Sequence, residues 1–222
     1  MATMLGACKE LCTSVRLRKF LGVVLKVGNR LNKAGNDRIS SKTAFSISSL
    51  PELNQVKAWD KKTTILSYIV ALIHKASNGE ILNVRNDLPN VIKSQKMSLN
   101  FEGQLQDLSQ QIDKMFQTAL ILAPPDFETR QEESNTSTEL IKLRASPLGT
   151  FVLDAKQRLL SLQANHNVVT TGYVHVLEYF AESEMSPNTL FTCITSFCDD
   201  LEAVKATLAK LKTSKGVGSW KN

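Results

Sequence analysis

Apolar residues recur at helical spacing along almost the whole of this 222-residue chain. We find no convincing run of strict apolar and polar alternation, the pattern of a half-buried strand. The sequence therefore predicts an all-α fold, an elongated multi-helix bundle with long antiparallel coiled-coil-like helices. The expected helices cover about 5–31, 60–77, 87–122, 147–162, 173–180 and 187–211.

Two of these helices carry apolar residues in the heptad spacing that is typical of coiled coils. The first heptad stretch consists of Phe101, Leu105, Leu108, Ile112, Met115, Ala119 and Leu122. The second consists of Leu190, Ile194, Phe197, Leu201, Val204, Leu208 and Leu211. We favour antiparallel packing of long helices inside the monomer, and an intermolecular coil is the alternative.

Several short signals predict where helices begin and end. Ser146-Pro147 and Ser186-Pro187 each place a capping serine before a proline, which needs no N–H partner at the first helical position. Asn78-Gly79 is expected to end the helix that begins near Asp60. Pro124-Pro125 should stop the first heptad helix and open an exposed acidic loop over 124–146.

Charge is distributed unevenly along the chain. The whole sequence has 27 basic and 21 acidic residues, a formal charge of +6. Residues 1–42 contribute nine of the cations against only Glu10 and Asp37. This end is expected to meet an acidic partner, which could be nucleic acid, an anionic membrane or an acidic protein surface, unless it is simply a solvated face.

The sequence favours binding over catalysis. We find no phosphate-binding glycine loop, no metal-protease motif and no nucleophile beside a base, so we expect no enzyme activity, no cofactor and no metal site. The four cysteines have no zinc spacing and are interpreted as reduced structural thiols. Charged residues near the N-terminus and the shortness of the apolar stretch 65–73 predict a cytoplasmic chain without a membrane span.

One segment is not explained by helix periodicity. Gly28 and Asn29 stand inside a predicted helix, where glycine costs about 1 kcal/mol relative to alanine. A missing side chain at Gly28 would let another backbone or an aromatic ring approach closely, while Asn29 and Asn32 project amides from one side of the helix. These residues predict a docking surface.

The order of motifs from Gly28 to Leu66 closely resembles the formin homology two domain, the actin-assembly module of formins. That family usually reads Gly-Asn-Tyr-Leu-Asn, then Gly-Phe-Lys-Leu, then Asp-x-Lys-x-Thr-Leu-Leu. Downstream, Tyr179-Phe180-Ala181-Glu182 is similar to the family's Tyr-Phe-Gly-Glu. The matching residues of the first block are Gly28, Asn29, Leu31, Asn32, Gly35, Phe45, Leu50, Leu53, Lys57, Asp60, Lys62, Thr64 and Leu66.

The resemblance implies an actin-binding chain of the cytoskeleton. Family domains form head-to-tail dimers at the barbed end of the filament, where they support nucleation and elongation. In each dimer an N-terminal segment, the lasso, wraps a region of the other subunit called the post. Family domains run from the lasso through a linker, a knob and a coiled coil to the post. The resemblance implies that this chain begins after the lasso, the linker and most of the knob, so that its activity alone is impaired. Profilin is expected only indirectly, through a proline-rich region that this sequence lacks.

The resemblance also assigns regions and residues. It implies a post-type motif region at 1–60, coiled-coil-like helices at 61–123, an acidic loop at 124–146 and C-terminal helices at 147–222. The lasso of another subunit is expected to dock on Gly28, Asn29, Leu31 and Asn32. The candidates for actin contact are Arg38, Lys42, Ser46 and Lys57.

Two departures from the family pattern affect these expectations. Ser46 replaces the family lysine that is expected to contact actin, and Arg30 replaces the usual tyrosine of the docking motif. The alternative function is therefore a helical scaffold or dimerisation module that has lost actin binding. Nucleic-acid binding through the basic N-terminal end is a third, disfavoured possibility.

Overall fold

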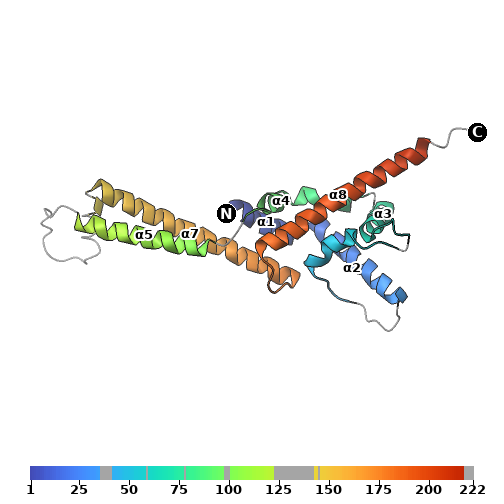
Figure 1. Cartoon of the computed structure of the whole chain (residues 1–222), viewed down its shortest axis with the longest axis horizontal. Helices are drawn as coiled ribbons and strands as arrows, with labels where there is room; N and C mark the ends of the chain where they lie inside the picture. The colour runs from blue at the N-terminus through green and yellow to red at the C-terminus, as the bar shows by residue number, and fades with distance from the viewer. Residues whose placement is uncertain are drawn as a thin grey trace, which may run out of the picture. The chain divides into compact units, whose positions relative to one another are not determined.

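The computed structural model describes residues 1–35, 42–58, 60–77, 79–97, 101–122, 143–144 and 146–217. Within these residues the predicted all-α class is confirmed, because helices account for the regular structure apart from one isolated bridge between Lys57 and Thr64. No helix of this described part is long and apolar enough to cross a membrane. The elements (Figure 1) are α1 Ala2–Thr13, α2 Val15–Gly35, η1 Ile47–Asn54, α3 Ile65–Ser77, η2 Glu80–Leu82, η3 Val84–Asp87, α4 Pro89–Ser94, α5 Glu102–Ile121, α7 Pro147–Phe180 and α8 Pro187–Val217.

The chain divides into two compact units. The major unit comprises residues 1–97 and 171–222, and the hairpin unit comprises residues 98–170. Helices α3 and α4 belong to the major unit, and α5 belongs to the hairpin unit. Most of the expected acidic loop lies outside the described residues.

The major unit is built around α8, which contacts η1, α3 and α4. Phe197 of α8 and Phe20 of α2 are both fully buried, with ring centroids 5.0 Å apart. The second predicted heptad is confirmed over most of its length, because five of its positions are at most 8% exposed. These positions are Leu190, Ile194, Phe197, Leu201 and Val204.

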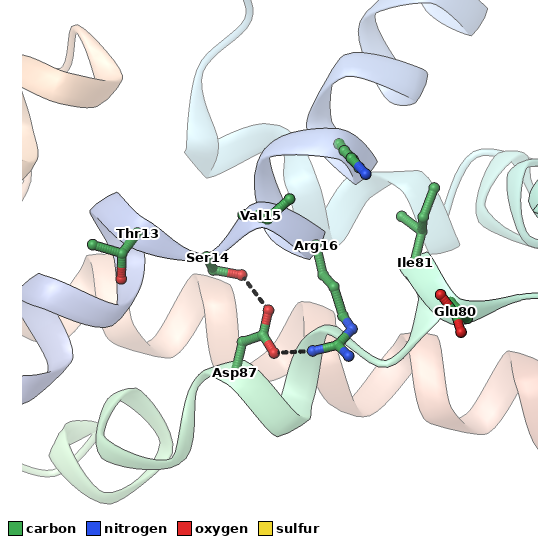
Figure 2. Close-up of a pocket in the computed structure, with 8 residues that line it drawn as sticks. Thr13, Ser14, Val15, Arg16, Glu80, Ile81 and Asp87 are labelled. Carbon is green, nitrogen blue, oxygen red and sulfur yellow. Dashed lines mark hydrogen bonds and ion pairs between the residues drawn. The ribbon is translucent and has the colours of Figure 1, made fainter.

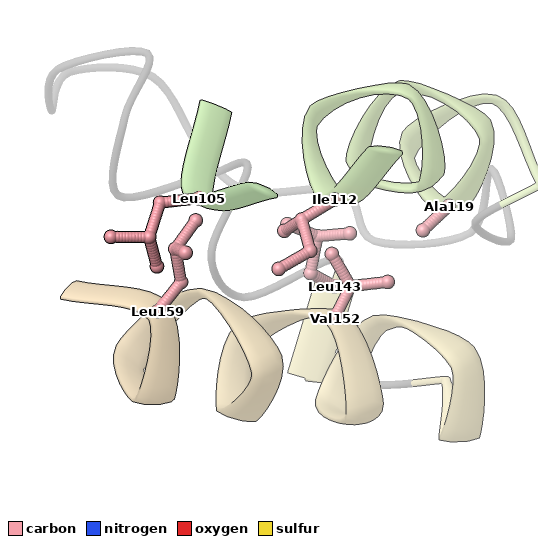
Figure 3. Close-up of a cluster of buried hydrophobic side chains, with 6 residues drawn as sticks. All are labelled: Leu105, Ile112, Ala119, Leu143, Val152 and Leu159. Atoms are coloured by element: carbon pink, nitrogen blue, oxygen red, sulfur yellow. The ribbon is translucent and has the colours of Figure 1, made fainter. Parts of the chain in front are cut away.

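The hairpin unit consists of α5 packed against the first part of α7. Figure 3 shows Leu105 beside Leu159 and Ile112 beside Val152, so the two helices run antiparallel. Lys156 extends the contact, with its ammonium 3.3 Å from the carboxylate of Asp113. This antiparallel pairing inside the monomer agrees with the expectation from the sequence.

Only half of the first predicted heptad is buried. Leu105, Ile112 and Ala119 are at most 9% exposed, whereas the alternate positions Leu108 and Met115 are 40% and 38% exposed. A single partner helix covers one row of an α-helix, and the row three residues further on points about 60° away from it. The heptad pattern is therefore present, but in the described residues one of its two rows has no covering helix.

The single helix expected over 5–31 is wrong, because the chain leaves helical geometry at Ser14, where φ is −63° and ψ is 110°. The Ser14 hydroxyl oxygen accepts a hydrogen bond from the N–H of Leu17 at 3.1 Å and so caps α2. It also donates to Asp87 at 2.9 Å. The apolar periodicity continues across this break, which explains why periodicity alone did not reveal it.

The helix expected over 87–122 is also wrong, since α4 ends at Ser94 and α5 begins at Glu102. The side-chain amide of Asn188, oriented to suit its neighbours, donates to the carbonyls of Gln95 and Met97 at 2.8 and 3.1 Å. These bonds satisfy carbonyl groups that a continuing helix would have used.

The serine–proline start signals are confirmed. The Ser146 hydroxyl accepts from the N–H of Gly149 at 2.9 Å, and Ser186 accepts from Thr189 at 3.2 Å. The separate short helix expected over 173–180 is wrong, because these residues form the last turns of the continuous α7.

Candidate functional site

Gly28 lies inside α2 with open space beside it. A Cβ atom built on Gly28 would meet no atom of the described residues within 4 Å. Close packing within the described part of the chain therefore does not explain a residue that costs about 1 kcal/mol in a helix interior. The open space is compatible with close approach by another molecule.

The side chain of Asn29 bonds to the chain's own backbone. Its amide nitrogen donates to the carbonyl of Lys42, and its amide oxygen accepts from the N–H of Lys42, both at 2.8 Å. Asn29 thus uses one amide N–H and one acceptor position on Lys42, whereas Asn32 is exposed on the surface. Asn29 fixes the point at which the chain returns to α2.

An apolar groove lies between α2 and α3 beside the motif. It has a volume of about 300 Å³, and two of its large apolar side chains, Leu31 and Tyr68, are about half exposed. Arg30, which stands where the family has tyrosine, is on its rim. The groove is lined by Val23, Lys26, Val27, Arg30, Leu31, Tyr68 and Leu72.

Ser46 and Ile47 are bonded to Glu182, which is 136 and 135 positions away in the sequence. One carboxylate oxygen of Glu182 accepts from the Ile47 N–H at 2.7 Å and from the Ser46 hydroxyl at 2.9 Å. Glu182 thus joins the two sequence blocks that carry the family resemblance. No local sequence pattern predicts this contact, because the residues that it joins are so far apart in the chain.

The turn before Glu182 explains the family glycine at the preceding position. Ala181 has a φ of +53°, in the left-handed region where a Cβ atom is unfavourable. Its N–H donates to the carbonyl of Glu178, and the N–H of Glu182 donates to that of Leu177, which is the Schellman pattern at a helix end. This pattern prefers glycine, so Ala181 stands in a strained position.

The Asp-x-Lys-x-Thr segment forms a tight turn that precedes α3. Asp60 accepts from the N–H groups of Lys62 and Thr63, and the Thr63 hydroxyl, followed by these N–H groups, lowers the pKa of the exposed carboxyl. Thr64 accepts from the N–H of Ser67 at 3.1 Å and caps α3. The helix start expected near Asp60 is thus wrong, because α3 begins only after the cap, at Ile65.

The four actin-contact candidates have different surroundings. Lys42, Ser46 and Lys57 are exposed, and Arg38 lies outside the described residues. Lys42 is fixed to α2 through Asn29, and Ser46 to the end of α7 through Glu182. The segment 42–47 is therefore held at both ends.

Two other features fit structural roles. All four cysteines are free, and burial raises the pKa of Cys8 to about 11 and that of Cys198 to about 12, so both thiols stay protonated near neutral pH. A hollow of about 550 Å³ lies at the junction of α1 and α2. Figure 2 shows the Asp87 carboxylate there between Ser14 and Arg16, and it bonds to both.

Comparisons with known proteins identify the family of this chain. The sequence model of the family described as Formin Homology 2 Domain matches residues 1–202. Human Protein diaphanous homolog 3 is 26% identical over 208 residues, and Formin-like protein 1 of Arabidopsis thaliana is 29% identical over 222 residues. These alignments cover 92% and 91% of this chain but only 16% and 20% of the relatives' length.

A second Arabidopsis thaliana protein, Formin-like protein 11, is 39% identical over 94 residues, which are 42% of this chain and 10% of that relative. The family match extends well beyond the block from Gly28 to Leu66, and it includes Glu182. The chain belongs to the formin homology two family.

Proposed function

We propose that this chain is the post-containing part of an actin-binding formin domain, which associates with filament barbed ends and supports nucleation and elongation as part of a dimer. The proposal rests on one observation: in this chain, which belongs to the formin homology two family, one side of α2 is cationic. Four exposed cations, spaced to share this side, are Lys19, Lys26, Arg30 and Lys33. The helix has no acidic residue, and no ion pair among the described residues involves these four cations.

An unneutralised cationic surface favours an acidic partner, such as the surface of actin. The candidates Lys42 and Lys57 are exposed, and Lys42 is anchored to the same helix by Asn29. Anchoring lowers the entropy that would be lost when a partner binds. We propose a cytoplasmic location on the cytoskeleton for this activity and assign no catalysis to the chain.

We also propose that α2 receives the lasso of another subunit. Gly28 has open space beside it, Asn32 is exposed, and Leu31 lines the groove between α2 and α3. An apolar or aromatic side chain of the lasso would fill this groove, since such anchors dominate binding at interfaces. In this proposal Asn29 supports the surface from behind, and the two cations Lys26 and Arg30 border it.

Charge reversal tests the actin proposal. The double variant Lys42→Glu and Lys57→Glu is expected to weaken binding to actin filaments about tenfold, or ~1.4 kcal/mol, because two exposed attractions become repulsions. Co-sedimentation with filaments and seeded barbed-end elongation measure the effect. The matched control is Lys93→Glu with Lys96→Glu, two exposed lysines at and just after the end of α4.

The proposal is refuted if the wild-type chain neither pellets with filaments nor changes elongation. Equal loss in both double variants would show a general charge effect rather than a site. The scaffold alternative predicts that neither variant changes anything, because it assigns no actin contact to these lysines.

Substituting the open glycine tests the docking surface. Gly28→Ala is expected to raise the free energy of unfolding by about 0.5–1 kcal/mol, because alanine favours helix and its Cβ meets no atom of the described residues. The same variant should weaken co-purification with a tagged formin homology two domain that has an intact lasso. Gly22→Ala is the control, since Gly22 lies in the same helix with equally open space. A glycine at 28 that could be changed without loss of docking would contradict the proposal.

A further inference from the structure

The groove between α2 and α3 has an apolar wall and a cationic wall. The apolar wall includes Leu31, Tyr68 and Leu72, which are 50%, 51% and 40% exposed. The cationic wall is the pair Lys26 and Arg30, which stand one turn apart on α2. Among the described residues, no acidic side chain lines the groove and no ion pair neutralises either cation.

Helix geometry places the two walls side by side. Lys26 directly precedes Val27, and Arg30 directly precedes Leu31, so each cation is rotated about 100° around α2 from an apolar lining residue. A cationic row and an apolar row therefore run next to each other along the helix, with about 5–6 Å between neighbours in a row. A side chain that enters the apolar row brings the residues beside it close to a cation.

We propose that this groove selects a protein segment in which a large apolar or aromatic anchor is flanked by acidic residues. The anchor would fill the apolar wall, and the flanking carboxylates would pair with Lys26 and Arg30. The inference deepens the docking proposal and rests on it, because it names the chemistry of the segment that docks on α2. Arg30 becomes a specificity-determining residue, since the family tyrosine at its position carries no charge.

The size and lining of the groove favour a protein segment over a small molecule. Its volume of about 300 Å³ is at the lower end of the range for small-molecule sites, and it suits one or two large side chains. The half-exposed Tyr68 adds a hydroxyl that can donate to a carboxylate or to a backbone carbonyl of the segment. Apolar anchor, carboxylate and carbonyl are all groups that a short acidic peptide supplies.

The same lining disfavours nucleic acid as the occupant. Proteins that hold single strands combine cations with several aromatic side chains on which successive bases stack. Tyr68 is the one aromatic residue among the described residues that line this groove. The other uncharged lining residues are aliphatic, and they match an apolar side chain better than a base or a phosphate: Val23, Val27, Leu31 and Leu72.

Fluorescence anisotropy of labelled peptides with the full chain tests the inference. The acidic probe is Gly-Glu-Glu-Trp-Glu-Glu-Gly, and the neutral probe has glutamine in place of every glutamate. The acidic probe is expected to bind about fivefold more tightly at low salt, because exposed ion pairs each add a modest attraction. Salt at about 1 M shortens the Debye length to about 3 Å and should remove most of this preference. An acidic probe with alanine in place of tryptophan should bind more weakly, because it lacks the anchor.

Two double variants locate the preference. Lys26→Gln with Arg30→Gln should bind the acidic and neutral probes equally, at about the wild-type affinity for the neutral probe. The matched control is Lys19→Gln with Lys33→Gln, two exposed cations of the same helix that do not line the groove. The control removes the same charge and should keep most of the fivefold preference. All four positions are exposed, and circular dichroism verifies that the helices form.

The outcomes separate this inference from the docking proposal. Equal binding of the acidic and neutral probes by the wild-type chain would overturn the inference and leave the docking proposal standing. Equal loss of the preference in the two double variants would show a general effect of charge, which also overturns the inference alone. Binding of neither tryptophan probe would overturn both proposals. A single-stranded oligonucleotide that binds more tightly than the acidic probe and displaces it would assign the groove to nucleic acid instead.

Discussion

Replacing Phe197 with alanine is expected to lower the free energy of unfolding of the major unit by about 3–5 kcal/mol. Phe197 is fully buried and packs against Phe20, so its removal leaves a cavity between α8 and α2. Small domains are stable by only about 5–15 kcal/mol, so this loss is a large part of the total. Urea unfolding followed by circular dichroism measures it.

Tyr179→Ala is the control for this prediction. Tyr179 is also aromatic and belongs to the major unit, but it is 42% exposed, so its loss should cost less than about 1 kcal/mol. A Phe197→Ala variant with wild-type stability would contradict the packing of α2 against α8. If our functional proposals hold, binding at α2 should weaken as well, because the variant loses a contact that positions this helix.

Replacing Glu182 with alanine is expected to destabilise the major unit by about 1.5–3 kcal/mol. The variant removes the charged acceptor of the Ile47 N–H, which is partly buried, and of the Ser46 hydroxyl. The measurements are urea unfolding and the amide exchange rate of Ile47, which should rise. If our functional proposal holds, actin binding should fall as well, because the segment 42–47 loses one of its two anchors.

Glu182→Gln serves as the conservative control. Its amide oxygen can still accept from the Ile47 N–H, so most of the stability should return. Ala181→Gly, one position earlier, should act in the opposite direction and stabilise by about 0.5–1 kcal/mol. Glycine relieves the left-handed strain, and its greater freedom in the unfolded chain offsets part of the gain. Unchanged Ile47 exchange in Glu182→Ala would contradict the role given to this carboxylate.

Local signals predicted the parts of the fold that depend on neighbouring residues. The α-helical class follows from periodicity, and the starts of α7 and α8 follow from a serine before a proline. The break at Ser14 was missed because the apolar rhythm continues through it. A capping serine followed by Val15, Arg16 and Leu17 has no proline or acidic residue to mark the start.

The candidate site was predictable only as far as motifs reach. The open Gly28 agrees with the idea that something outside the helix requires it, whereas the bonding of Asn29 to Lys42 depends on where the loop returns. How much of the first heptad is buried depends on how many helices surround α5. The spacing of apolar residues does not reveal that number. The contact of Glu182 with Ser46 depends on tertiary structure, so no reading of local sequence could have supplied it.

The contact between Glu182 and Ser46 has a consequence for how the sequence can change over evolution. The family usually has lysine at position 46, and a lysine there would place its ammonium near the Glu182 carboxylate. In this chain the uncharged Ser46 hydroxyl donates a hydrogen bond to the Glu182 carboxylate instead. Glu182 is therefore expected to be retained among relatives whether position 46 carries lysine or serine, because either side chain can donate to its carboxylate.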